Sequence, residues 1–240
     1  MNKLMYSAAI FFLLMSCAEE TAAETTETPS NDTTEANNDS ANVEVVEEAT
    51  LNFEYFEDYA ALTTKTKLYE HFTEDQLRDD TTWYAEGTVM RMSTVLKDGE
   101  RTINFVWAED DNESLENIEA HAQLWSEDWS ATSRQAMPSQ CGITLGASLA
   151  ELVEWNGAAV HFSGFGWDYA GGIFELPEYG GKLLDCETGI RLDMDYSDES
   201  QDWTHLYGDM ELNSEMDGIL DAPIFVGVFS YYLPSEEIAE

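Results

Sequence analysis

Residues 142–172 read GITLGASLAELVEWNGAAVHFSGFGWDYAGG, and they contain the clearest start and stop signals for a helix in the chain. Ser148 stands three residues before Glu151, the spacing of a capping box, in which each side chain bonds the other residue's backbone N–H. Apolar side chains then recur through 149–153 with the period of a helix. Gly157 follows the last turn and readily takes the left-handed conformation that ends helices. The stretch therefore predicts a short helix.

Strand signals flank this helix on both sides. Residues 160–163 and 190–196 alternate between apolar and polar side chains, as half-buried strands do. Asp98-Gly99 lies between two further runs of this kind, and an Asp-Gly pair in that position favours a tight hairpin. Residues 224–232 are apolar on both faces, which predicts a strand in the interior of a sheet.

A second helix is expected nearer the start of the domain. Thr66 has the residue type of an N-cap for a helix over 67–72. Helix, hairpin and strand then occur twice in the same order, in 51–140 and in 141–240. We therefore expect an α+β fold, with short helices packed on an antiparallel β-sheet and two similar helix-then-meander halves. The pattern leaves open whether the two halves share one core.

The N-terminus has the features of an export signal. A basic residue precedes an apolar run that is too short to cross a bilayer as a helix. Leu14-Met15-Ser16-Cys17 resembles the lipobox of bacterial lipoproteins, a family in which the signal peptide is cleaved before the Cys and the Cys is acylated, with palmitate for example. The resemblance implies a signal peptide over 1–16 and a lipid on Cys17. The alternative is an ordinary secretory signal with an incidental cysteine.

The segment after Cys17 has the composition of a disordered linker. Residues 17–50 are mostly Glu, Thr, Ala, Asn, Ser and Asp, and no basic residue occurs between Lys3 and Lys65. Such a segment cannot bury enough apolar surface to offset the entropy of ordering. We therefore expect an acidic stalk over 17–50. Glu19-Glu20 resembles the acidic surface-export signal of Bacteroidota lipoproteins, which implies the outer membrane or the cell surface.

The charge of the chain excludes one class of partner. The formal net charge is −39, and it becomes −40 when the predicted signal peptide is removed, because residues 1–16 contain one Lys and no acid. Phosphate backbones are bound by clustered Lys and Arg, so we expect no nucleic-acid partner. The acidic surface is explained most simply by solubility, especially in salty surroundings.

Two cysteines remain besides Cys17, and they predict a structural role. Cys141 and Cys186 form an even pair in a chain with an export signal, which favours a disulfide. Neither cysteine belongs to a C-x-x-C motif or has a His at metal-ligand spacing. We expect no metal, no cofactor and no catalytic residue.

Trp167, Asp168 and Tyr169 are the strongest candidate binding residues. A Trp and a Tyr on either side of an acid can stack on a sugar ring or form the central contact of a protein interface. The alternative is structural, with Trp167 filling the core at a bulge and Asp168 accepting backbone N–H bonds. Asp168 and Glu175 are also the residue types of a glycosidase acid pair, although the sequence does not place them at the required separation.

Two resemblances bear on the function. Leu152 to Gly157 followed by Phe162 to Tyr169 is similar to uncharacterised lipoproteins of Bacteroidota. The helix-then-meander order more weakly resembles the α+β units of β-lactamase-inhibitor-protein-like and SmpA-like envelope proteins, which act by binding other proteins. We therefore expect a lipid-anchored, non-enzymatic envelope protein that binds a protein or a glycan. The alternatives are a hydrolase that uses acidic residues and a proteinaceous enzyme inhibitor.

Overall fold

The computed structural model describes residues 51–84, 87–125, 131–195, 197 and 202–234. The predicted signal peptide, the predicted lipid site at Cys17 and the predicted stalk over 17–50 lie outside the described residues. All described residues belong to one unit, residues 48–240.

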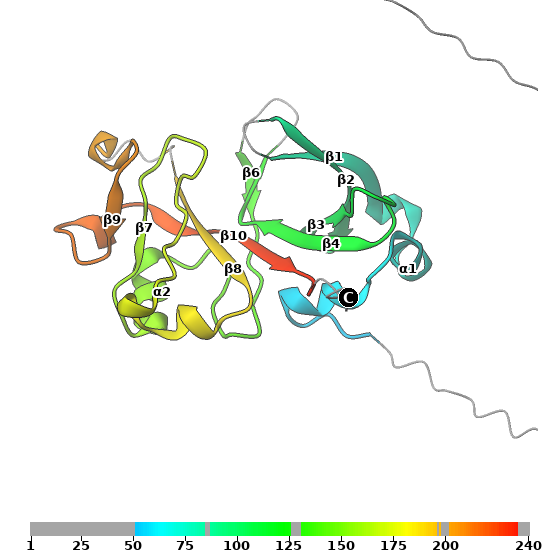
Figure 1. The fold of residues 1–240 in the computed structure, drawn as a ribbon, viewed down its shortest axis with the longest axis horizontal. Coiled ribbons are helices and arrows are strands. Elements are labelled where there is room, and N and C mark those ends of the chain that lie inside the picture. The colour runs from blue at the N-terminus through cyan, green and yellow to red at the C-terminus, as the bar shows by residue number, and fades with distance from the viewer. Residues whose placement is uncertain (1–50, 85–86, 126–130, 196, 198–201, 235–240) are drawn as a thin grey trace, which may run out of the picture. The chain divides into compact units, whose positions relative to one another are not determined.

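A six-stranded antiparallel sheet forms the centre of the domain (Figure 1). Its strands, in spatial order, are β1 (Leu77–Tyr84), β2 (Val89–Asp98), β3 (Arg101–Trp107), β4 (Leu115–His121), β10 (Ile224–Tyr232) and β8 (Gly189–Met194). Two small sheets adjoin it, formed by β5 (Gln123–Trp125) with β6 (Ala131–Arg134) and by β7 (His161–Ser163) with β9 (Glu211–Asn213). The fold is thus mostly antiparallel β with short helices, as the sequence predicts.

The helices are short and lie between the strands. The two α-helices are α1 (Lys65–His71) and α2 (Leu149–Asn156). The 3₁₀ turns are η1 (Phe56–Ala61), η2 (Glu74–Gln76), η3 (Pro177–Tyr179), η4 (Lys182–Asp185), η5 (Thr204–Leu206) and η6 (Ile219–Asp221).

The predicted helix of the 142–172 stretch is confirmed as α2. Glu151 N donates to Ser148 Oγ over 3.3 Å, and Ser148 N donates to Glu151 Oε2 over 2.7 Å, which completes the capping box. Gly157 ends the helix with a φ of +75°. The helix buries Leu149 and Leu152, the apolar positions that the spacing predicts.

The hairpin and the two strongest strand predictions are also confirmed. Asp98 pairs with Arg101, so that Gly99 and Glu100 form a two-residue loop, and Gly99 has the positive φ of +62° that such loops require. In β8 the alternate residues starting at Ile190 are buried. The strand β10 lies between β4 and β8 and is buried over most of its length, which agrees with an interior strand.

Two details of the prediction are wrong. The N-cap of α1 is Thr64 rather than Thr66, because Thr64 has an extended backbone and its side chain accepts a hydrogen bond from Lys67 N. Thr66 lies within the first turn instead. The polar and irregular sequence of residues 125–140 predicts a long surface connection, but residues 131–134 within it form β6 by pairing with β5.

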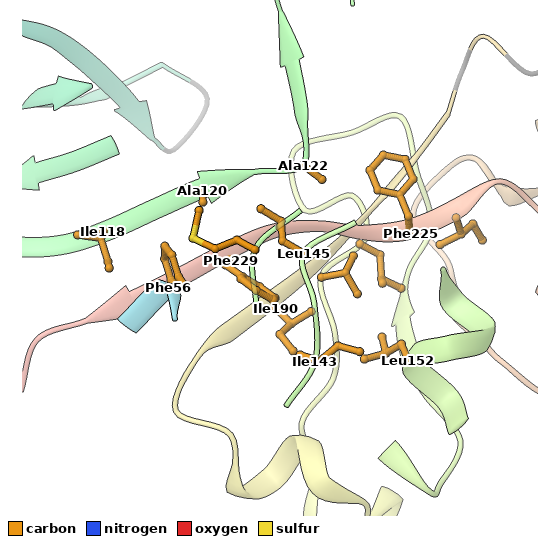
Figure 2. Packing of buried hydrophobic residues seen from close by; sticks show 14 of the residues in the cluster. Phe56, Ile118, Ala120, Ala122, Ile143, Leu145, Leu152, Ile190, Phe225 and Phe229 are labelled. Atoms are coloured by element: carbon orange, nitrogen blue, oxygen red, sulfur yellow. The ribbon is translucent and has the colours of Figure 1, made fainter. Parts of the chain in front are cut away.

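The predicted repeat of two similar halves is not confirmed. The last strand, β10, pairs with β4 from the first half on one side and with β8 from the second half on the other. One buried cluster contains side chains from both halves. Figure 2 shows part of it, where Ile118 and Ala120 of β4 lie near Phe229 of β10, Ile190 of β8 and Phe56 of η1.

Candidate functional site

The predicted aromatic residues lie on a loop that is held at both ends by close backbone contacts. At its start, Gly164 N donates to Met210 O over 2.9 Å, and a Cβ on Gly164 would lie 2.6 Å from the carbonyl oxygen of Gly208. At its end, Leu192 N of β8 donates to Gly171 O over 2.9 Å. Backbone approaches this close leave room only for glycine, which explains the glycines around the aromatic residues.

Within the loop, Trp167 and Tyr169 contact each other and differ in burial. Trp167 is half-buried, and its Nε1–H donates to Gly164 O over 2.8 Å, which fixes the indole. The ring of Tyr169 lies 5.4 Å from the ring of Trp167 in an edge-to-face arrangement, with 68% of the residue exposed. Trp167 lies outside the buried cluster of the described residues. The loop therefore presents an ordered indole with a projecting phenol beside it.

A hollow of about 480 Å³ lies against this loop, and we call it the aromatic pocket. All three predicted residues line it together with six others, among them Phe174, Arg191 and Asp209. Its volume falls within the range of about 300–1,000 Å³ that is common for small-ligand sites.

The aromatic pocket combines aromatic ring faces with both hydrogen-bond acceptors and hydrogen-bond donors. The carboxylates of Asp168 and Asp209 can accept hydrogen bonds, whereas the guanidinium of Arg191 can only donate them. Aromatic faces with polar groups at their edges suit a ligand that has one apolar face and a polar rim. A sugar ring has this character.

The sequence identified three of the nine residues that line this pocket. Arg191 occupies an outward position of the alternating strand β8, and Phe174 and Asp209 lie in connections on either side of it. Their convergence results from the pairing of 163 with 172 and of 164 with 210. The outward position of Arg191 on β8 was the one feature of the sequence that could have predicted a pocket residue beyond 167–169.

The predicted acid Glu175 and the histidine His161 lie elsewhere. Glu175 is not one of the residues that line the aromatic pocket, so Asp168 and Glu175 do not face each other across it. His161 Nδ1 lies 3.0 Å from Glu211 Oε1, and the imidazole stacks on the ring of Tyr179 with 3.7 Å between centroids. This histidine is packed between Glu211 of β9 and Tyr179 of η3.

Cys141 and Cys186 are joined in the structure. Their Cα atoms are 5.5 Å apart, a distance typical of disulfides, and the bridge connects the approach to α2 with the segment after η4. Two hydrogen bonds support the same junction, from Trp155 Nε1 to Cys141 O and from Leu183 N to Asn156 Oδ1.

Neither a metal site nor a membrane span is found in the described residues. Across the described ranges, no three His, Cys, Asp or Glu side chains are grouped so as to hold a metal ion. Of the helices that the structure describes, none is long and apolar enough to cross a bilayer.

Comparison with known proteins returns no relative for this chain. No family model, no curated protein and no solved structure matches it. The resemblance to Bacteroidota lipoproteins and the weaker one to inhibitor-like envelope modules therefore stay predictions.

Proposed function

We propose that the chain is a lipid-anchored binding module of the outer membrane or cell surface, and that it holds a saccharide in the aromatic pocket without catalysing a reaction. The observation that carries this proposal is the gathering of Trp167, Tyr169 and Phe174 around one hollow with Asp168, Asp209 and Arg191. A ligand held there stacks on the ring faces and exchanges hydrogen bonds with the charged groups.

The lipobox resemblance at Leu14 to Cys17 supports the anchor. Stable attachment to a membrane requires more than one acyl chain, and the family resemblance implies several on one cysteine. The intact mass of the purified protein tests this part of the proposal. We expect a mature chain that begins at acylated Cys17, and a mass that still includes residues 1–16 would overturn the anchor.

Calorimetry with soluble oligosaccharides tests the pocket. Full-length protein in detergent is titrated with cello-, xylo-, manno- and chito-oligosaccharides at millimolar concentration. At least one is expected to bind, and Tyr169→Ala is expected to weaken binding about 10- to 30-fold, as loss of a central aromatic contact does. Tyr232→Ala is the matched control, since Tyr232 is also exposed but lies outside the aromatic pocket.

Three outcomes would change the proposal. The absence of saturable heat with every oligosaccharide would refute saccharide binding, and equal affinity of the Tyr169 and Tyr232 variants would place the ligand elsewhere. Release of shorter sugars during the titration would replace the binding module with the hydrolase alternative.

A protein ligand is the second candidate, because Trp, Tyr and Arg are the residue types enriched at the energetic centres of protein interfaces. Trp167, Tyr169 and Arg191 supply all three on one surface. A pull-down from envelope extract with the wild type and with Tyr169→Ala tests it. A partner retained by the wild type alone would favour this candidate over a saccharide.

A further inference from the structure

The face of the six-stranded sheet away from η1 and α1 curls over itself between β1 and β4. Asn104 Nδ2 of β3 donates to Thr82 Oγ1 of β1 over 2.7 Å, although β2 lies between these strands. Tyr84 Oη of β1 donates to Glu119 Oε1 of β4 over 2.9 Å, across two intervening strands. Neighbouring strands are about 4.8 Å apart, so β1 and β3 would be roughly 10 Å apart in a flat sheet, too far for Thr and Asn side chains to meet.

The strand register shows how strong this curl is. Asn104 lies in the same row as Val95, and Val95 pairs with Arg78 of β1. Thr82 is four residues further along β1 than Arg78, so the end of β1 must bend across the sheet to reach Asn104. Figure 1 shows β1 and β2 arching over β3 and β4. We call this curled part of the sheet the β1–β4 roll.

The β1–β4 roll encloses a hollow of about 420 Å³. Polar side chains from all four strands and from β5 line it, among them Thr82, Ser93, Asn104, Glu119, His121 and Gln123. None of the residues that line this hollow also lines the aromatic pocket. This hollow and the aromatic pocket are therefore separate recesses, and the lining of the one in the roll contains more polar side chains.

Two buried polar atoms at this hollow have no hydrogen-bond partner among the described residues. They are Ser93 Oγ, on a residue that is only 1% exposed, and Asn104 Oδ1. The amide of Asn104 is already engaged with Thr82 through its nitrogen. If the amide were turned over, its nitrogen would become the unpaired atom, so one polar atom of Asn104 stays unpaired in either orientation. Buried polar atoms are almost always paired, so two unpaired atoms beside one hollow need a partner such as ordered water or a ligand.

The charged groups at the hollow are already compensated. Arg78 and Asp80 form an ion pair over 2.8 Å, and Glu119 accepts the hydrogen bond from Tyr84. Burial raises the pKa of Glu119 above its usual value. An anionic ligand would also be repelled by a chain of net charge −39. These features favour a neutral ligand rich in hydrogen-bonding groups.

We propose that the β1–β4 roll is a second binding site, for a small neutral polyhydroxylated molecule such as a monosaccharide or a polyol. A ligand hydroxyl donates to Asn104 Oδ1, and another bonds to Ser93 Oγ, so that both atoms gain partners. Hydroxyl groups suit the site because each both donates and accepts, and the remaining lining residues supply acceptors and donors in turn. The hollow is large enough for one sugar ring.

Calorimetry of the full-length protein in detergent, with a panel of monosaccharides and cyclic and linear polyols, tests this site. At least one compound is expected to bind saturably. Ser93→Ala is expected to weaken its binding about 3- to 10-fold, the effect of losing one hydrogen bond. The same variant is expected to leave the thermal stability of the unliganded protein unchanged or raised, because it removes a buried unpaired hydroxyl. A purely structural Ser93 would instead lower that stability.

Two further variants locate the ligand. Asn104→Ala is expected to weaken binding as Ser93→Ala does, whereas Tyr169→Ala, in the aromatic pocket, is expected to bind like the wild type. The proposal is overturned if no compound gives saturable heat, if Ser93→Ala binds as tightly as the wild type, or if only Tyr169→Ala loses binding. The last result would assign the sugar to the aromatic pocket, so the two proposals can fail independently.

Discussion

Reduction of the Cys141–Cys186 bridge should destabilise the domain by an amount that follows from the length of the loop it closes. The two residues are 45 positions apart. In the chain-entropy model, a loop of this length restricts the unfolded chain by about 4 kcal/mol at 25 °C. For a domain of this size, each kcal/mol corresponds to about 2–4 °C in melting temperature, so we expect a decrease of roughly 8–16 °C.

Thermal unfolding followed by circular dichroism, with and without a phosphine reductant, measures this effect. The control is the double variant Cys141→Ser/Cys186→Ser, which should melt near the reduced wild type and should not respond to reductant. Mapping of free thiols in the untreated protein should label neither cysteine. A shift below about 2 °C, or labelling of both thiols before reduction, would refute the reasoning.

Three further changes test other parts of the fold. Ser148→Ala should destabilise the domain by about 1 kcal/mol in urea unfolding, because it removes the cap of α2. Gly171→Ala should destabilise it by about 2–3 kcal/mol, since its Cβ would lie 2.0 Å from a carbonyl oxygen of β8. Its control is Gly157→Ala, which also has a positive φ but open space around the new Cβ and should lose only about 1 kcal/mol. Burial and the hydrogen bond to Asp98 raise the pKa of Tyr59 to about 12, so the neutral phenol stabilises the folded state below pH ~10. In the wild type this contribution to the free energy of unfolding should disappear between pH ~10 and 12. The variant Tyr59→Phe should not show this loss of stability.

Local signals predicted the elements whose structure depends on neighbours in the sequence. The capping box of Ser148 and Glu151 set the start of α2, and Asp98-Gly99 set the hairpin between β2 and β3. In β8, the alternation that starts at Ile190 matches the burial of the strand. In each case the pattern and the physical cause lie within about ten residues.

Features that depend on distant segments could not be predicted in this way. Met90 and Met92 share a face of β2 with Leu96, yet Leu96 is fully buried and the two methionines are exposed, because the curled end of the strand extends beyond the core. The hydrogen bond between Thr82 and Asn104 depends on the same curl. Likewise, Arg191 joins the aromatic pocket only because β8 pairs with the end of the aromatic loop.

The position of β10 has a consequence for how the chain acquires its structure during synthesis. Until Ile224–Tyr232 has emerged, the open edge of β4 has no partner, and β8 cannot join the sheet. Native pairing across the centre thus waits until the last of the described strands has been made. Until then the edge of β4 is exposed to non-native strand pairing.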